Sequence, residues 1–200
     1  MAKKTSVRAA RDRWADWALV GVLVVALLLG WGVMAIAEGQ RGTYTNANAG
    51  LTVHYPQDWL VKNDENLAFR AVNPDSGEFG TTYEVRVQPI DTTGAATSTL
   101  ALVLNNASLL RAQQGTAYRL FDVVEGPRKD GQPTMEATYV YVAEGGDFFV
   151  QRMPVVVEGL DVAVAQGDKA YVFSLLAAKD AFAAAERDFR RFVESVEIKK

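Results

Sequence analysis

Few residues of this chain could act as a nucleophile or a general base, because it contains one histidine, His54, and no cysteine. The missing cysteine excludes disulfides, thiolate metal sites, thiol nucleophiles, a lipobox anchor and covalently attached c-type haem. A Ser–His–Asp hydrolase would need His54 as its base, oriented by a carboxylate and placed beside an exposed serine. The chain has no G-x-S-x-G elbow, and a lone histidine without a placed partner is weak evidence for acid–base catalysis. We therefore expect no catalytic residues and no enzyme activity.

Metal binding would depend on carboxylate oxygens. The candidates are Asp130, Glu136, Asp147, Asp161 and Asp168, each in or beside a glycine turn, where aspartate is common for backbone reasons. The stretch "KDGQPTME" lacks the D-x-D-x-D-G spacing of a calcium loop. Neither G-x-x-x-x-G-K-S/T nor a strand followed by G-x-G-x-x-G occurs, so a nucleotide site has no support. The sequence predicts neither a metal site nor a cofactor.

Charge is distributed unevenly along the chain. Residues 1–16 carry five basic and two acidic side chains, a net charge of +3, whereas the whole chain carries −3. Residues 17–200 therefore carry −6. Nucleic acid binding needs lysine and arginine to neutralise phosphates. We expect no nucleic-acid partner.

The elements that follow the basic N-terminus decide where the protein is located. Trp17 to Ala37 is a run of 21 residues without a charge. At about 1.5 Å per residue, a helix of this length spans roughly 31 Å, close to the hydrocarbon thickness of a bilayer, about 30 Å. Trp17 and Trp31 lie towards its ends, where tryptophan favours the membrane interface. The segment predicts a single transmembrane helix, with residues 1–16 in the cytoplasm and residues 38–200 on the periplasmic side of the cell membrane.

Two features of this segment leave alternatives open. The tripeptide "AIA" at 35–37 fits a signal-peptidase site, although the apolar run exceeds the roughly 7–15 residues of a signal peptide. An uncleaved signal-anchor is favoured, and cleavage after Ala37 stays open; both alternatives export the domain. Ala26 and Gly30 form a small-xxx-small pair that would allow close contact with a helix of another subunit, although such residues are common in membrane spans.

The exported part is predicted to begin with a linker, residues 38–50, followed by a domain of residues 51–200. Leu51–Tyr55 alternates as a strand, which directs His54 away from the core. Pro56 ends this strand, and the turn after it lets Trp59 fold back over the sheet.

Further along, the pattern predicts strands, a helix over 99–114, more strands and a final helix over 180–196. The other expected strands are 67–72, 83–90, 118–125, 134–143, 148–157, 162–166 and 170–177, with the break near Gly159 unsettled. In strand 83–90, Tyr83 and Val85 face one side, and Glu84 and Arg86 the other. The final helix carries an apolar stripe that suits the face of a sheet. This order indicates an α+β fold, an antiparallel sheet with helices on its faces.

Two stretches resemble a known family. "GLTVHYPQDW" contains Tyr55, Pro56 and Trp59, and "KAYVFSLLAAKDAFAAAERDFRRFVESVEI" contains an aromatic-rich strand and a phenylalanine-bearing helix. Its fold-determining phenylalanines are Phe182, Phe189 and Phe192. Together these stretches resemble the PsbP-like domain family, over residues 43–200. The resemblance implies an α-β-α sandwich and a non-catalytic role in proteins that dock on membrane complexes, assist their assembly or tune nearby ion sites. No metal ligands carry over.

The resulting functional hypothesis is a membrane-anchored, non-catalytic accessory or assembly subunit. It would dock on a photosynthetic or respiratory electron-transfer complex and contact the bilayer and other membrane subunits. The alternative is a solute- or lipid-binding module at the envelope surface. An aromatic group on neighbouring strands suits either sheet core or, in this alternative, a ligand pocket. Its members are Tyr139, Tyr141, Phe148, Phe149, Tyr171 and Phe173.

Overall fold

The computed structural model describes residues 17, 19–30, 41–91, 93–114, 116–143 and 153–199. The chain divides into two units, residues 1–41 and residues 42–200. Within the first unit, residues 17 and 19–30 are helical and expose their apolar side chains. In the part of the chain that the structure describes, no helix is both long enough and apolar enough to cross a membrane. Residues 18 and 31–37 of the predicted 17–37 span, including Trp31, lie outside the described residues, so the membrane span stays a prediction.

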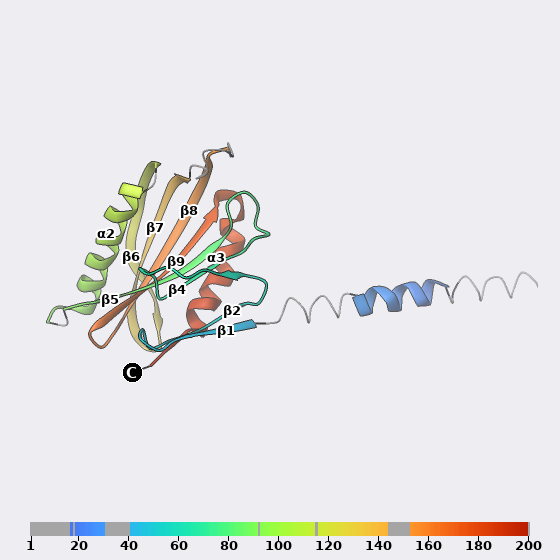
Figure 1. Cartoon of the computed structure of the whole chain (residues 1–200), viewed down its shortest axis with the longest axis horizontal. Helices are drawn as coiled ribbons and strands as arrows, with labels where there is room; N and C mark the ends of the chain where they lie inside the picture. The colour runs from blue at the N-terminus through green and yellow to red at the C-terminus, as the bar shows by residue number, and fades with distance from the viewer. Residues whose placement is uncertain are drawn as a thin grey trace, which may run out of the picture. The chain divides into compact units, whose positions relative to one another are not determined.

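The second unit is built on a seven-stranded antiparallel sheet with the order β3-β4-β5-β9-β8-β7-β6. One helix, α2, covers one face of this sheet, and α3 covers the other (Figure 1). A smaller sheet has the order β1-β2-β10. The elements are β1 Arg41–Asn46, β2 Leu51–Pro56, β3 Leu60–Val61, β4 Phe69–Val72, β5 Thr82–Pro89, α2 Ala96–Gln114, β6 Thr116–Lys129, β7 Gln132–Ala143, β8 Val155–Gln166, β9 Lys169–Ala178, α3 Lys179–Ser195 and β10 Glu197–Ile198. The predicted α-β-α sandwich is confirmed.

The larger core lies between the sheet and α3. The Phe189 ring is completely buried, and its centroid lies 5.2 Å from the centroid of the Tyr83 ring. Phe192 packs against the same tyrosine at 4.8 Å. Each buried aromatic side chain removes a large apolar area from water, which is the main source of stability for such a layer. Lys129 completes the end of α3 by donating hydrogen bonds to the carbonyl oxygens of Glu194, at 3.3 Å, and Val196, at 3.1 Å.

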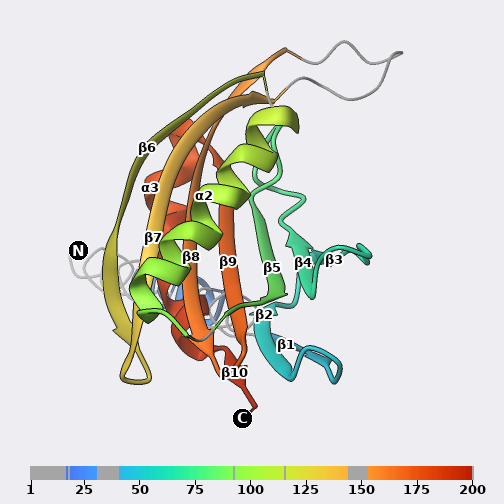
Figure 2. The ribbon, with the colours of Figure 1, turned by 90° about the vertical axis from the view of Figure 1, so that its left-hand side faces the viewer.

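On the opposite face, α2 lies diagonally over the sheet (Figure 2). Leu100, Val103 and Leu104 pack on a second apolar cluster that includes Met135 and Val172. The helix packs mainly against β6, β7 and β8. α2 therefore does not pack over β5, which lies close to one edge of the sheet. Other residues line this face of β5.

The structure corrects one predicted boundary and decides another that the sequence leaves open. The predicted linker 38–50 contains strand β1, which adds to β2 at the edge of the small sheet. Its small polar residues give no apolar alternation, and Tyr44 holds it to the core by packing on Phe69, with 5.3 Å between the ring centroids. The open alternative concerns Gly159, which lies inside a continuous β8. A Cβ atom there would overlap the Tyr139 ring on β7, so the glycine makes room for a ring and does not break the strand.

Candidate functional site

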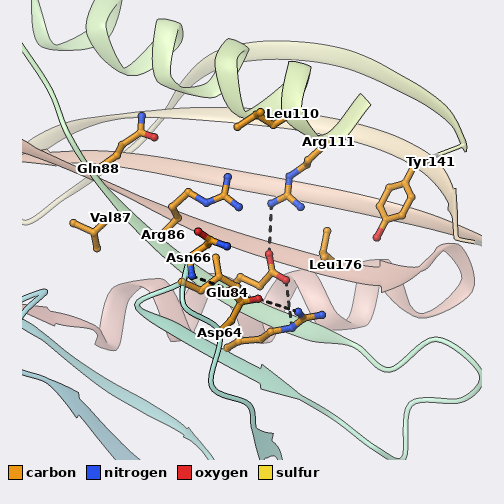
Figure 3. Close-up of a pocket in the computed structure, with 12 residues that line it drawn as sticks. Asp64, Asn66, Glu84, Arg86, Val87, Gln88, Leu110, Arg111, Tyr141 and Leu176 are labelled. Atoms are coloured by element: carbon orange, nitrogen blue, oxygen red, sulfur yellow. Dashed lines mark hydrogen bonds and ion pairs between the residues drawn. The ribbon is translucent and has the colours of Figure 1, made fainter. Parts of the chain in front are cut away.

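A pocket of about 610 Å³ opens on the α2 face of the sheet, between α2 and β5. Figure 3 shows its lining, which combines charged side chains with a few apolar ones. The residues that line it are Asp64, Asn66, Leu67, Arg70, Glu84, Arg86, Val87, Gln88, Leu110, Arg111, Tyr141 and Leu176. A pocket of this size is within the range that small-molecule ligands occupy, roughly 300–1,000 Å³.

Strand periodicity and helix periodicity place the charged residues of this pocket. On β5, Tyr83 and Val85 enter the α3 core, so Glu84 and Arg86 must point to the opposite face. Arg111 is the one charged residue of α2. It follows Leu104 by two helical turns, on the stripe that faces the sheet, and its guanidinium therefore reaches inward.

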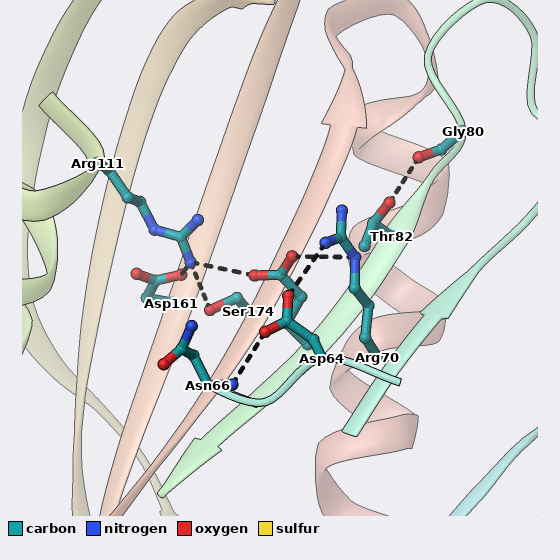
Figure 4. A network of polar contacts seen from close by, with 9 residues as sticks. Asp64, Asn66, Arg70, Gly80, Thr82, Arg111, Asp161 and Ser174 are labelled. Atoms are coloured by element: carbon teal, nitrogen blue, oxygen red, sulfur yellow. Dashed lines mark hydrogen bonds and ion pairs between the residues drawn. The ribbon is translucent and has the colours of Figure 1, made fainter. Parts of the chain in front are cut away.

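Arg111 is held over a row of polar side chains that crosses three strands. Glu84 on β5 pairs with Ser174 on β9, and Ser174 pairs with Asp161 on β8. The Nη2 atom of Arg111 donates to Ser174 Oγ at 2.8 Å and to Asp161 Oδ1 at 3.2 Å, and it lies 3.8 Å from Glu84 Oε2 (Figure 4). Three polar side chains in the middle of a sheet would be costly without such a partner.

Tyr139 completes the buried side of this network. Its hydroxyl donates a hydrogen bond of 3.0 Å to Asp161 Oδ1, and the Arg111 guanidinium lies 5.1 Å from the centroid of its ring. Burial raises the pKa of the Tyr139 hydroxyl well above its usual value, against the opposing effect of Arg111. For Arg111, burial is the largest single influence and lowers the pKa, but the attractions of Asp161, Tyr139, Glu84 and Tyr141 together outweigh it and the pKa is raised. The arginine therefore stays charged and the tyrosine stays protonated at neutral pH.

A second arginine, Arg70 on β4, serves the outer carboxylates of the pocket. Its Nη1 lies 3.6 Å from Asp64 Oδ2, and its Nε lies 3.5 Å from Glu84 Oε1. Arg70 and Arg111 thus share Glu84 between them, one on each side. Every carboxylate of the network, Asp161 included, faces at least one arginine.

Arg86 differs from the other two arginines. It lines the same pocket, yet among the described residues it has neither a hydrogen bond nor an ion-pair partner. The Nε atom of Arg111 is also buried without a hydrogen bond. Tyr141 contributes a hydroxyl to the lining, and burial raises its pKa to about 12, so it remains a protonated donor at neutral pH. The pocket therefore offers unused donors together with fixed charges, an arrangement suited to binding a polar group.

The residues singled out from the sequence lie elsewhere. His54 faces outward as predicted, and its Nδ1 shares a hydrogen bond of 3.1 Å with Thr43 Oγ1. Trp59 covers the α3 core, with its ring 4.4 Å from the Tyr83 ring. Tyr55 packs on Phe69, and Phe182 lies half-buried at the margin of the same core. They support the fold and take no part in the pocket, as does Pro56 at the end of β2.

The interpretation of the carboxylates as turn residues is wrong at two positions. Asp161 is a buried strand residue, only 2% exposed, and Glu136 on β7 accepts a bidentate pair from Arg190, at 2.9 and 3.1 Å. Asp130 does lie in a turn, with a positive φ of 49°. Asp147 lies outside the described residues. Within the described part of the chain, no three histidine, cysteine, aspartate or glutamate side chains converge as they would around a metal ion.

The predicted aromatic group is divided between the two faces of the sheet. Tyr139 and Tyr141 lie on the α2 face, and Tyr141 lines the pocket. Tyr171 and Phe173 lie in the α3 core. Phe148 and Phe149 are outside the described residues. Arg111 is not among the residues predicted from the sequence, although a signal exists for it, since it is the one charged residue of α2 and falls on the apolar stripe of that helix.

The α-β-α sandwich of this chain is similar to the fold of several solved structures. The solution structure of cyanobacterial PsbP (CyanoP) from Synechocystis sp. PCC 6803 has a TM-score of 0.58 at 15% identity. The alignment covers 80% of this chain and 92% of the CyanoP chain. The Saccharomyces cerevisiae Ran-binding protein Mog1p has a TM-score of 0.52 at 10% identity, and the alignment covers 80% of this chain and 95% of the Mog1p chain. LpqN, a Mycobacterium tuberculosis protein involved in cell envelope biogenesis, has a TM-score of 0.50 at 13% identity, and the alignment covers 80% of this chain and 91% of the LpqN chain.

No known protein family and no curated protein matches the sequence. At identities of 10–15%, the likeness to these three structures concerns the fold. The PsbP-like fold that the two sequence stretches indicate is therefore confirmed, and function must be argued from the site and surface of this chain.

Proposed function

We propose that this protein is a membrane-anchored, non-catalytic accessory or assembly subunit whose extracytoplasmic domain docks on a membrane electron-transfer complex. Residues 17–37 would anchor it in the bilayer of the cell membrane, with the N-terminus in the cytoplasm. The electron-transfer assignment follows from the PsbP-like resemblance. The observation that carries the docking role belongs to α2.

The outer face of α2 has no charge. Its one charged residue, Arg111, turns inward, whereas Leu102 and Leu109 are 61% and 65% exposed. A helix on the surface of a monomeric protein ordinarily carries charged residues on its outer face. Exposed leucines without charges are the composition found at the centre of protein interfaces. We assign this surface, the α2 outer face, to contact with another membrane-protein subunit.

The docking role can be tested by gentle extraction from the native membrane followed by native gel analysis. The wild-type chain should migrate within a larger complex, and migration as a lone species of 21.8 kDa would contradict the proposal. The double variant Leu102→Ser/Leu109→Ser should lose this association while it keeps its melting temperature. Leu60→Ser is the matched control, because Leu60 is 55% exposed on β3, away from α2.

The anchor needs a separate experiment. We expect the protein to resist extraction by alkaline carbonate and to have the intact mass of the full chain. A mass that corresponds to residues 38–200 would instead show cleavage after Ala37. Release of the uncleaved chain by carbonate would contradict the membrane span.

The pocket beside α2 favours a second candidate, a solute-binding module at the envelope surface. Its lining carries five charged side chains. A lipid chain would cover these charges and leave Arg86 desolvated without a partner, which is costly. The pocket therefore favours a polar solute over a lipid.

A further inference from the structure

We infer that the pocket between α2 and β5 binds the carboxylate of a small organic monoanion, with Arg86 as the residue that receives it. This inference concerns a ligand site and does not depend on the docking role of the α2 outer face. Four observations on the described residues carry it: the unpaired arginine, the paired carboxylates, the apolar patches and the protonated tyrosine.

The unpaired arginine determines the sign of the ligand's charge. Arg70 and Arg111 already face Asp64, Glu84 and Asp161 at 3.2–3.8 Å. Arg86 projects from β5 toward α2, on the same side of the sheet as Arg111, without a partner of its own (Figure 3). A half-buried guanidinium presents a planar set of N–H donors that matches a carboxylate in a bidentate arrangement. An anion would therefore complete this side of the pocket.

The carboxylates of the lining limit the charge of that anion. Asp64 and Glu84 line the same pocket as Arg86, and with Asp161 they set three carboxylates against Arg70 and Arg111, so Arg86 brings the cluster to a net charge of zero and leaves no surplus positive charge. A phosphate dianion would bring a second negative charge into repulsion with them. A cation would find both carboxylates already paired and would face Arg86. A monocarboxylate satisfies Arg86 at the lowest electrostatic cost.

The rest of the lining suits a short apolar body. Val87, Leu110 and Leu176 contribute apolar surface to the pocket, and Leu110 is 50% exposed at its α2 wall. The Tyr141 hydroxyl, with its pKa raised to about 12 by burial, remains uncharged and does not repel an anion at neutral pH. The area that a few methylene groups of a ligand remove from water against these three side chains favours binding.

The test is titration calorimetry on the full chain in a non-ionic detergent, with sodium butyrate as the probe. Butylamine has the same chain length with the opposite charge, and inorganic phosphate carries the second negative charge. We expect butyrate to bind with one site per chain, and the two other probes to bind at least tenfold more weakly. Binding of butylamine or phosphate as tight as that of butyrate would overturn the inference, as would the absence of butyrate binding.

Variants then locate the site. Arg86→Gln removes the charge and should weaken butyrate binding about tenfold or more, the loss expected for a charge-assisted hydrogen bond. Arg86→Lys keeps the positive charge but loses the planar guanidinium. Its affinity for butyrate should fall between those of Arg86→Gln and wild type. Arg187→Gln on α3 is the matched control, since Arg187 is exposed on the opposite layer of the sandwich, and its affinity should equal that of wild type. Unchanged melting temperatures without butyrate would show that both variants fold, and equal affinity of Arg86→Gln and wild type would place the ligand elsewhere.

Discussion

The hydroxyl of Tyr139 donates a 3.0 Å hydrogen bond to Oδ1 of Asp161, the same oxygen that lies 3.2 Å from Arg111 Nη2. One carboxylate oxygen thus joins β7, β8 and α2 beneath the pocket. Asp161 is 2% exposed, so its charge depends on these two partners for stabilisation.

This arrangement predicts a large cost for Asp161→Ala. The substitution leaves the Arg111 guanidinium buried with only the more distant Glu84 as counter-ion, and breaking a buried pair in this way costs about 3–5 kcal/mol. Tyr139→Phe removes one hydrogen bond and should cost only about 1–2 kcal/mol. Urea unfolding of the purified chain measures both values. Asp188→Ala, at an exposed position on α3, is the control and should change the free energy of unfolding by no more than about 0.5 kcal/mol. Equal effects at positions 161 and 188 would contradict the network.

Gly159 provides a test of the packing beneath the same tyrosine. A Cβ atom at this position would overlap the Tyr139 ring, which has no space to move because its side chain is buried. Gly159→Ala should therefore destabilise the fold by about 1–3 kcal/mol through overpacking. Gly94→Ala is the control, since a Cβ atom there meets only Thr99 Oγ1 at 3.5 Å. A melting temperature of Gly159→Ala at or above that of wild type would show that the ring does not occupy this space.

The sequence predicts the scaffold of this domain well because its signals are local. The alternation at Leu51–Tyr55 and the apolar stripe around Phe189 each arise within one element, and both appear where expected. The same local signals leave the strand around Gly159 open, since a glycine in a strand indicates an interruption unless a ring from the neighbouring strand is known to lie over it. That ring belongs to Tyr139, 20 positions earlier in the sequence.

The site could not be predicted in the same way. Glu84, Arg111 and Asp161 come from three distant parts of the chain and meet only through the register of β5, β9 and β8 and the placement of α2. Glu84 alternates like a solvent-facing residue, yet it is buried where the side chains of Arg70 and Arg111 lie against it. An acidic residue beside a glycine also favours a turn on composition alone, which is why Asp161 was misassigned. Pairing between distant strands is the information that a single sequence lacks.

His54 and Trp59 share the stretch "GLTVHYPQDW", but alanine should leave the stability nearly unchanged at His54 and lower it clearly at Trp59. His54 has one exposed hydrogen-bond partner, Thr43, so His54→Ala should change the free energy of unfolding by no more than about 0.5 kcal/mol. Trp59→Ala removes an indole ring that lies 4.4 Å from Tyr83 and covers the α3 core. Because Trp59 is only half-buried, we expect Trp59→Ala to lower the free energy of unfolding by about 2–4 kcal/mol, somewhat less than for a fully buried ring. Thermal melts of the two variants compare them directly, and a larger effect at His54 would invert this assignment of faces.

Alkaline pH should weaken the fold through its buried tyrosines. Burial raises the pKa of Tyr141 from 10.0 to about 12, and it also raises the pKa of Tyr83 and Tyr139. A tyrosine whose pKa is higher in the folded state than in the unfolded state contributes stability that is complete below pH 10. That stability is lost as the pH rises through the folded-state pKa, because the unfolded chain releases its proton first. For Tyr141 the loss between about pH 10 and pH 12 is on the order of 2–3 kcal/mol. Tyr141→Phe should reduce the slope of stability against pH in this window, as measured by urea unfolding at a series of pH values. A variant whose stability falls as steeply as that of wild type would show that the Tyr141 hydroxyl is not shielded from water in the pocket.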